Sequence, residues 1–185
     1  IGIRRQAAEA LGAIGTEAVP ALIQSLKDER STVRFNAVKA LGTIGPKAKP
    51  AVPALIQLLK GESIGIRRQA AEALAEIGPA TATEVPALIQ ALKDESWVVS
   101  SQAAKALGAI GAEAKPAVPA LVQALKDESW VVSSQAAEAL AQIGAEAVPA
   151  LSQLLEDANS EVRLNAAKAL GTIGPEAVPT LIQLL

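Results

Sequence analysis

Paired acidic residues are the groups in this sequence whose type and spacing come closest to supporting chemistry. Asp-Glu occurs at 28–29, 94–95 and 127–128, and Asp157 stands alone at the corresponding place of a further copy. Neighbouring carboxylates can bind a cation, but calcium takes about six or more oxygen ligands, and the sequence shows no loop with that ligand spacing. Each pair precedes a predicted helix, whose N-terminus interacts favourably with negative charge. We therefore expect these residues to be structural and predict no metal site.

The usual catalytic side chains are missing from the sequence. It contains no His, Cys or Tyr, so its serines have no histidine to activate them and no thiolate nucleophile exists. We expect a non-enzymatic protein with no catalytic residues and no cofactor. The absence of cysteine also leaves the redox compartment open.

Charge is distributed unevenly along the chain. Residues 1–93 carry a net charge of +4 and residues 94–185 a net charge of −6. Six basic residues of the first half fall on predicted helices: Arg4, Arg5, Arg34, Lys39, Arg67 and Arg68. A surface that follows phosphates needs more positive charge than this, without the interleaved Glu9 and Glu72. Nucleic acid is therefore not an expected partner, and no apolar run of about 18 residues predicts a membrane span.

The acidic pairs recur because the chain is a tandem repeat. Residues 91–104 and 124–137 are identical, and Ile-Gly ends every copy, with glycines at Gly15, Gly45, Gly78, Gly111, Gly144 and Gly174. A period of about 30 to 33 residues is typical of helical solenoids. The near-identity of neighbouring copies indicates recent duplication or deliberate design, and both readings stay open.

Each copy begins with a short helical pattern. In the first copy the apolar residues Val19, Leu22, Ile23 and Leu26 have the i, i+3, i+4, i+7 spacing of one helix face. A proline near the start of the pattern, such as Pro20, is tolerated in the first helical turn. Three extra residues in the longer copies all fall between the closing glycine and this proline. We expect them to lengthen a loop or to add a partial turn.

A longer helical pattern follows in each copy. Its expected N-caps are Ser63, Ser96, Ser129 and Asn159, with Arg30 as a poor substitute in one copy. Val99, Ala103, Ala106, Leu107 and Ile110 lie within about 100° on a helical wheel and should form the buried face. Gly111 should end this helix with left-handed dihedral angles. The whole chain, residues 1–185, is thus predicted to be one all-α array of about twelve helices.

The shared pattern PxLIQxLKDxxxxVRxxAAxALGxIG resembles the HEAT repeat, especially the short HEAT-like repeats of phycobilisome lyases and of artificial libraries built on them. The resemblance covers essentially the whole chain and implies a right-handed superhelix of antiparallel helix pairs, with the second helices on the concave face. It also implies an Asp–Arg ladder between neighbouring units. The arginine is present as Arg4, Arg34, Arg67 and Arg163, but Ser100, Ser133 and Gly61 depart from the pattern, so the ladder should be broken in the middle. Some lyase relatives handle bilin pigments, but no residue specific to that chemistry is found here.

The positions that vary between copies share one face of the second helix. We predict a non-catalytic scaffold that binds a protein or peptide on the concave face. The expected contact residues are Trp97, Val98, Ser101, Gln102, Lys105, Trp130, Val131, Ser134, Gln135 and Glu138. The two tryptophans are either binding anchors or packing residues that seal the stack, and the sequence does not decide between these roles.

The two ends of the array lack polar capping repeats, because the chain starts in a second helix and stops in a first helix. We expect a segment of a longer chain that is cut in mid-repeat at both ends. The alternative function is a structural spacer or a self-assembling rod in which uncapped repeats stack end to end.

Overall fold

The computed structural model describes residues 2–61, 63–78 and 82–182, and within these ranges the regular secondary structure is entirely helical. Within these ranges the side chains of residues 2–5 and of Ala8 are not described. The side chains of Arg4 and Arg5 therefore lie outside the described part of the structure. Contacts within the chain define two compact units, unit 1 (Ile1–Ala80) and unit 2 (Thr81–Leu185). That the two form one array stays a prediction.

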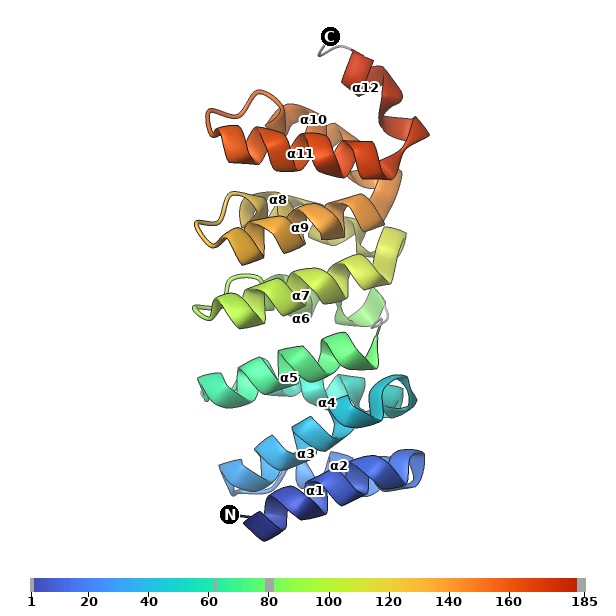
Figure 1. Ribbon diagram of the computed structural model, residues 1–185, viewed down its shortest axis with the longest axis vertical. Coiled ribbons are helices and arrows are strands. Elements are labelled where there is room, and N and C mark those ends of the chain that lie inside the picture. Colours follow the sequence, from blue (N-terminus) through green and yellow to red (C-terminus); the bar gives the residue numbers. More distant parts are fainter. Residues whose placement is uncertain (1, 62, 79–81, 183–185) are drawn as a thin grey trace. The chain divides into compact units, whose positions relative to one another are not determined.

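Unit 1 alternates short and long helices. Its short helices are α2 (Val19–Ser25) and α4 (Val52–Leu58), and its long helices are α1 (Gly2–Ile14), α3 (Ser31–Ile44) and α5 (Ile64–Ile77). The long helices α1, α3 and α5 pack side by side in chain order, and the short helices lie behind them (Figure 1).

Unit 2 repeats this arrangement. The short helices are α6 (Val85–Ala91), α8 (Val118–Leu125), α10 (Val148–Leu154) and the final α12 (Val178–Ile182), and the long helices are α7 (Trp97–Ile110), α9 (Trp130–Ile143) and α11 (Ser160–Ile173). In Figure 1 the long helices α7, α9 and α11 form the front layer and α6, α8 and α10 the layer behind. The predicted all-α solenoid of stacked helix pairs is thereby confirmed.

The core consists of the predicted apolar stripes. Val99, Ala103 and Leu107 of α7 are buried, as expected, whereas Ile110 is only half-buried. Small residues let the long helices approach closely: a Cβ added to Gly108 would lie 2.9 Å from the Cα atom of Ala139 in α9. The close packing of α7 against α9 therefore depends on a residue without a side chain.

The long helices start directly after the predicted capping residues, but most of these residues do not form the side-chain cap hydrogen bond that the sequence predicts. Among the four predicted capping residues, Asn159 alone accepts a backbone bond at its helix start, from the Glu161 N–H at 2.8 Å. In two of the other copies the preceding aspartate, Asp94 or Asp127, accepts the N–H of the capping serine, at 2.9 and 2.8 Å. Gly111 has a φ of 71° with a ψ of −141°, which is a glycine region outside the left-handed helical well.

Arg34 and Arg163 bind the loops of their own repeats, which differs from the expected ladder between repeats. Arg34 Nη1 donates to the carbonyl oxygens of Asp28 and Glu29, both at 2.8 Å, which belong to the loop that precedes its own helix. Arg163 binds the carbonyls of its own loop in the same way. Ion pairs that do join neighbouring repeats in unit 2 include the one between Lys126 Nζ and Asp157 Oδ2, at 2.6 Å.

The longer connections contain an added 3₁₀ turn. The 3₁₀ segments Gly45–Ala51 and Gly111–Ala117 have seven residues each, whereas Gly15–Ala18 has four. The added turn buries one alanine completely, Ala48 in one connection and Ala114 in the other. The third long connection contains residues 79–81, which lie outside the described residues.

None of the described helices has both the length and the apolar composition that crossing a lipid bilayer would require.

Candidate partner-binding face

The candidate site of unit 2 is the side of α7, α9 and α11 that carries the variable positions, named here the second-helix face. On α9 the residues Trp130, Ser134 and Glu138 follow one another at intervals of four, so the helical period places them in one line along the helix. Trp97, Ser101 and Lys105 form the equivalent line on α7. The fold therefore repeats the same three-position line from one long helix to the next.

Most of the predicted contact residues reach the surface of this face. The side chains of Trp97 and Trp130 are 54% and 68% exposed, and Val131 is also exposed. Lys105 and Glu138 are exposed, and Gln102, Ser134 and Gln135 are half-buried. Tryptophan is seldom left this open in a monomer, which makes these two rings the most distinctive groups of the face.

Two of the predicted contact residues are not accessible. Val98 and Ser101 are only 6% and 3% exposed, so a partner could contact them only if the side chains around them repacked, and their contact stays a prediction. Ser101 lies on the side of α7 that faces α9, where Gly108 allows the two helices to approach closely, and its hydroxyl donates to the Val98 carbonyl at 3.1 Å. Sequence variation alone did not show how closely this one pair of helices packs.

A groove of about 310 Å³ runs between α9 and α11. It is lined by Trp130, Ser134, Ala137, Glu138, Ala141 and Gln142 from α9 and by Asn165, Lys168, Ala169 and Thr172 from α11. The sequence prediction missed the α11 residues, although Asn165 and Lys168 occupy the same repeat positions as Gln102 and Lys105. Extending the variable positions to the next copy would have found them.

A glutamine and an acidic residue form a recurring polar pair on the long helices. Gln135 Nε2 donates to Glu138 Oε2 at 2.7 Å, and Gln69 Nε2 donates to Glu72 Oε2 at 3.1 Å in unit 1. In α7 the acidic partner is replaced by Lys105, and the Gln102 Oε1 atom is buried without a hydrogen-bond partner among the described residues. The glutamine–glutamate hydrogen bond is thus present on α9, whereas α7 has no acidic residue at the equivalent position to form it.

Unit 1 has a counterpart groove of about 430 Å³ between α3 and α5. Its lining includes Lys39, Thr43, Gln69, Glu72 and Glu76, and no tryptophan occurs in this unit. The same geometry therefore carries a charged lining in unit 1.

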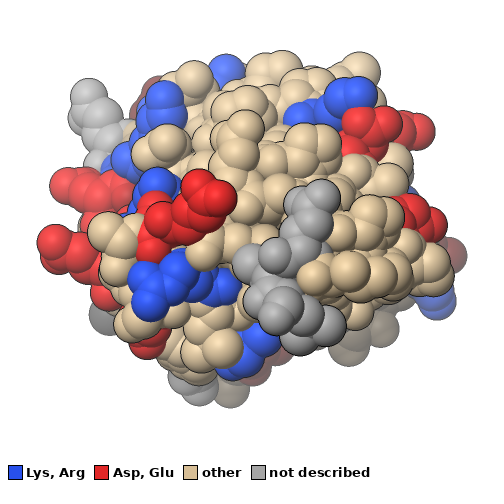
Figure 2. Space-filling model, turned by 90° about the horizontal axis from the view of Figure 1, so that it is seen from above, with Lys and Arg blue, Asp and Glu red and all other residues tan. Residues whose placement is uncertain are grey.

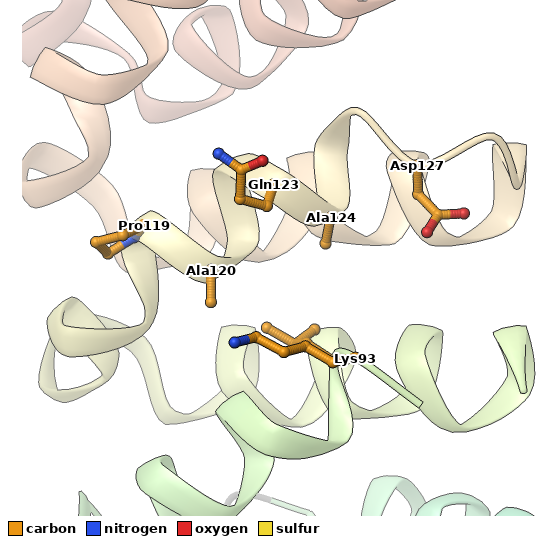
Figure 3. Close-up of a pocket in the computed structure, with 7 residues that line it drawn as sticks. Lys93, Pro119, Ala120, Gln123, Ala124 and Asp127 are labelled. Atoms are coloured by element: carbon orange, nitrogen blue, oxygen red, sulfur yellow. The ribbon is translucent and has the colours of Figure 1, made fainter. Parts of the chain in front are cut away.

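A third groove, of about 470 Å³, lies on the short-helix layer of unit 2 between α6 and α8 (Figure 3). Pro119, Ala120 and Gln123 line one side, and in Figure 3 the Lys93 side chain extends along the groove away from Asp127. The sequence did not predict this groove. Its proline, alanine and glutamine recur in almost every copy of the repeat. The lining therefore does not distinguish this groove from the equivalent surface of the other repeats.

The end of unit 2 at α11 and α12 exposes apolar surface. Val178 and Ile182 are 47% and 61% exposed, and a Cβ added to Gly171 would meet nothing within 4 Å. Figure 2 views the molecule from above, from the side of this end, and shows charged side chains gathered towards the edges with uncharged surface between them.

The perturbed carboxylates lie in loops, outside the second-helix face. The hydrogen bond from Lys126, together with the Asn159 N–H, lowers the pKa of Asp157 below its usual value. The Arg30 side chain and N–H likewise lower the pKa of Asp28. Both shifts favour the charged form and so indicate structural ion pairs, whereas an acid–base catalyst would have a pKa moved towards neutrality.

Comparisons with known proteins agree with this architecture. The sequence model of a family described as HEAT repeats matches residues 2–60, 52–118 and 118–185. An engineered protein of known crystal structure is 28% identical, with a TM-score of 0.67 over 93% of this chain and 90% of its own. Computationally designed armadillo repeat proteins for modular peptide recognition are similar at 25% identity and a TM-score of 0.67, with 91% of each chain covered.

A natural protein assembly is also similar in structure. The complex of CpcE and CpcF of phycocyanin lyase from Nostoc sp. PCC7120 matches at 27% identity with a TM-score of 0.65, over 99% of this chain and 82% of that chain. Among curated proteins, none matches this chain.

Proposed function

This chain belongs to the HEAT repeat family, and from that premise we propose that it is a non-catalytic scaffold whose second-helix face binds a protein or peptide partner. The observation that carries the proposal is the exposure of Trp97 and Trp130 at equivalent positions of consecutive repeats. Exposed tryptophans beside a polar border are typical of interface hot spots.

The exposure of the two rings favours anchoring over sealing. A ring that closed the gap between neighbouring helices would be largely buried, whereas more than half of each tryptophan side chain is open here. The α9–α11 groove begins at Trp130 and continues past Ser134 to Glu138 and Lys168. These groups can bury an apolar side chain and bind charged and hydrogen-bonding groups at the same time.

The similar structures support a binding role. The designed armadillo proteins are described as made for peptide recognition, and the CpcE–CpcF structure is a complex of two proteins. Repeat solenoids bind partners along extended faces, so we place the partner on the face that varies between repeats. The groove holds carboxylate, amide, hydroxyl and amino groups without a histidine or thiol, which fits binding better than catalysis.

Selection of peptides against the folded chain tests this function. Peptides from a random library are selected, and their affinities are compared for the wild type, Trp97→Ala, Trp130→Ala and a control, Gln123→Ala, on the short-helix layer. We expect either tryptophan variant to weaken binding by about 30-fold, which corresponds to about 2 kcal/mol. The proposal fails if the tryptophan variants bind like the control, or if they lose stability while affinity per folded molecule is unchanged.

A second candidate function is self-assembly through the apolar end at α12. The exposed Val178 and Ile182 favour it, since exposed apolar surface tends to associate. Light scattering should then show a mass that grows with protein concentration, and Val178→Lys should stop the growth. A mass that stays constant over the accessible concentration range would exclude this function.

A further inference from the structure

One position of the long helices alternates in charge from repeat to repeat. The residues at this position are Glu9, Lys39, Glu72, Lys105, Glu138 and Lys168. In unit 2 the order is lysine on α7, glutamate on α9 and lysine on α11, and all three side chains are exposed. Neither lysine forms a side-chain ion pair or hydrogen bond with the described residues, although Glu138 and Lys168 line the same groove. Their charges are therefore available to a partner.

The tryptophans form a second row beside this charged row. Trp97 and Trp130 precede Lys105 and Glu138 by eight residues each, which is about 12 Å along the helix axis at 1.5 Å per residue. Between the rows, Ser134 is half-buried on α9 and Ser101 is buried on α7, so no large side chain stands at these positions. The face thus has an aromatic row on α7 and α9 and a charged row on α7, α9 and α11, where Ser160 of α11 occupies the tryptophan position.

The spacing of the two rows fits an α-helix. A helix with its side chains is about 10–12 Å wide, which matches the separation of the two rows. Packed helices are about 8–10 Å apart, and seven residues of a helix rise about 10.5 Å, so residues at i, i+7 and i+14 reach three successive long helices on nearly one side.

We propose that the partner segment is an amphipathic helix lying across α7, α9 and α11. Its charged stripe reads acidic, basic, acidic at seven-residue intervals and pairs with Lys105, Glu138 and Lys168. A second stripe is apolar and packs on Trp97 and Trp130, and a small residue between the stripes faces Ser134. This inference rests on the proposed function and specifies the partner that the face selects.

A charge-swap cycle tests the inference. The probe is a helix-favouring, tryptophan-free peptide of about 18 residues with the acidic, basic, acidic stripe, and a second peptide has the middle residue changed from lysine to glutamate. Because Trp97 and Trp130 are the only tryptophans of the chain, their fluorescence reports binding directly. Both peptides are measured with the wild type and with Glu138→Lys at low salt, where surface charges are least screened.

The expected pattern is reciprocal. The wild type should bind the first peptide about tenfold more tightly than the second, and Glu138→Lys should reverse that preference. Lys168 has no side-chain partner among the described residues. The Lys168→Glu variant should prefer a peptide in which the acidic residue that pairs with position 168 is replaced by lysine. Circular dichroism confirms that each variant stays folded.

The outcomes separate the two proposals. If helical peptides bind and change the tryptophan fluorescence but the four affinities do not depend on charge order, the scaffold function stands and the helix register proposed here is wrong. If helical peptides fail to bind while selected peptides that depend on Trp130 bind in an extended form, the helical partner is excluded. If nothing binds at the tryptophans in either experiment, both proposals fall.

Discussion

Units 1 and 2 use the same pair of helix layers to build two different surfaces. In unit 1 the groove between α3 and α5 is lined by Lys39, Glu72 and Glu76, whereas the α9–α11 groove of unit 2 starts at the exposed Trp130. The residues buried beneath are nearly the same: Leu41 and Leu107 are equivalent and both fully buried. The difference shows that the repeat fixes the core and leaves one face free to vary.

The loops before the tryptophan-bearing helices α7 and α9 are held differently from those of unit 1, whereas the loop before α11 is held by Arg163 as in unit 1. In unit 1 Arg34 donates two hydrogen bonds to loop carbonyls, and Arg67 binds the Gly61 carbonyl at 3.0 Å. In unit 2 the equivalent Ser100 reaches the Asp94 carbonyl at 3.0 Å, but Ser133 turns back to the carbonyl of Trp130 in its own helix. The arginine is thus absent where the tryptophans occur, and the loop is held there by shorter side chains.

Removal of a core leucine should have the largest effect and should be alike in both units. Leu107→Ala and Leu41→Ala each delete a fully buried side chain, so we expect each to lower the free energy of unfolding by about 2–5 kcal/mol. Denaturant unfolding followed by circular dichroism measures both. A loss below about 0.5 kcal/mol for either would mean that the side chain lies outside the core, and a large inequality would mean that the two cores are not equivalent.

The leucine positions illustrate how far the sequence predicts the fold. The helical spacing around Val99, Ala103 and Leu107 identified the buried face, because burial of an amphipathic stripe depends on local periodicity. The loop bonds of Arg34 were not predicted, since the spacing of Asp and Arg is the same whether the guanidinium binds its own loop or the neighbouring repeat. Only the conformation of the loop, with its carbonyls turned inward, distinguishes the two.

The sequence predicted the exposure of this face only in part, for a similar reason. The variable positions include Trp97 and Trp130, which are exposed, but also Ser101, which is buried on the side of α7 where Gly108 brings α9 close. The distance between two helices depends on the smallest residues of both, and α9 has Ala141 where α7 has Gly108. The sequence pattern of a single repeat therefore does not predict the distance between the long helices of neighbouring repeats.

Replacement of the loop-binding arginine should have the next largest effect and should separate the units. Arg34→Ser leaves the carbonyls of Asp28 and Glu29 without their charged donor, so we expect a loss of about 1–3 kcal/mol. Ser133→Ala is the matched change in unit 2 and removes only a bond within α9, so we expect less than about 1 kcal/mol. Equal losses from the two variants in thermal unfolding would show that the arginine does not hold the loop.

Shortening of a long connection should have a smaller effect. Deletion of Lys47–Lys49 converts that connection to the short form already present at Gly15–Ala18, and it removes one buried methyl group, that of Ala48. We expect cooperative unfolding to persist with a loss of about 1 kcal/mol.

The matched deletion of Glu113–Lys115 in unit 2 removes the buried Ala114 and also the exposed ion pair between Lys115 and Glu146 at 2.5 Å. We expect a slightly larger loss from it at low salt, because exposed ion pairs are screened. Calorimetry that shows a non-cooperative transition for either deletion would mean that the added 3₁₀ turn is required for stacking.

The smallest expected effect concerns the ion pair between Lys126 and Asp157 in unit 2, whose contribution to stability depends on pH. Lys126 and the Asn159 N–H lower the pKa of Asp157 in the folded state, so the ionised carboxylate is bound more favourably there than in the unfolded chain. Its contribution is therefore fully present above the unfolded pKa of about 3.9 and is lost as the pH falls towards the lower folded pKa. Asp157→Asn should reduce stability near neutral pH and flatten the acid limb of the stability curve.

Asp127→Asn is the matched control for this change. Asp127 accepts the same kind of backbone bond, from the Ser129 N–H at 2.8 Å, but no lysine ion pair is described for it. The two variants should differ near pH 7 at low salt and converge in acid or at high salt, where protonation or screening removes the attraction of Lys126. If the two aspartate variants behave alike at every pH and salt concentration, the Lys126–Asp157 pair adds nothing to the backbone bond, and the stacking of these two repeats does not depend on that ion pair.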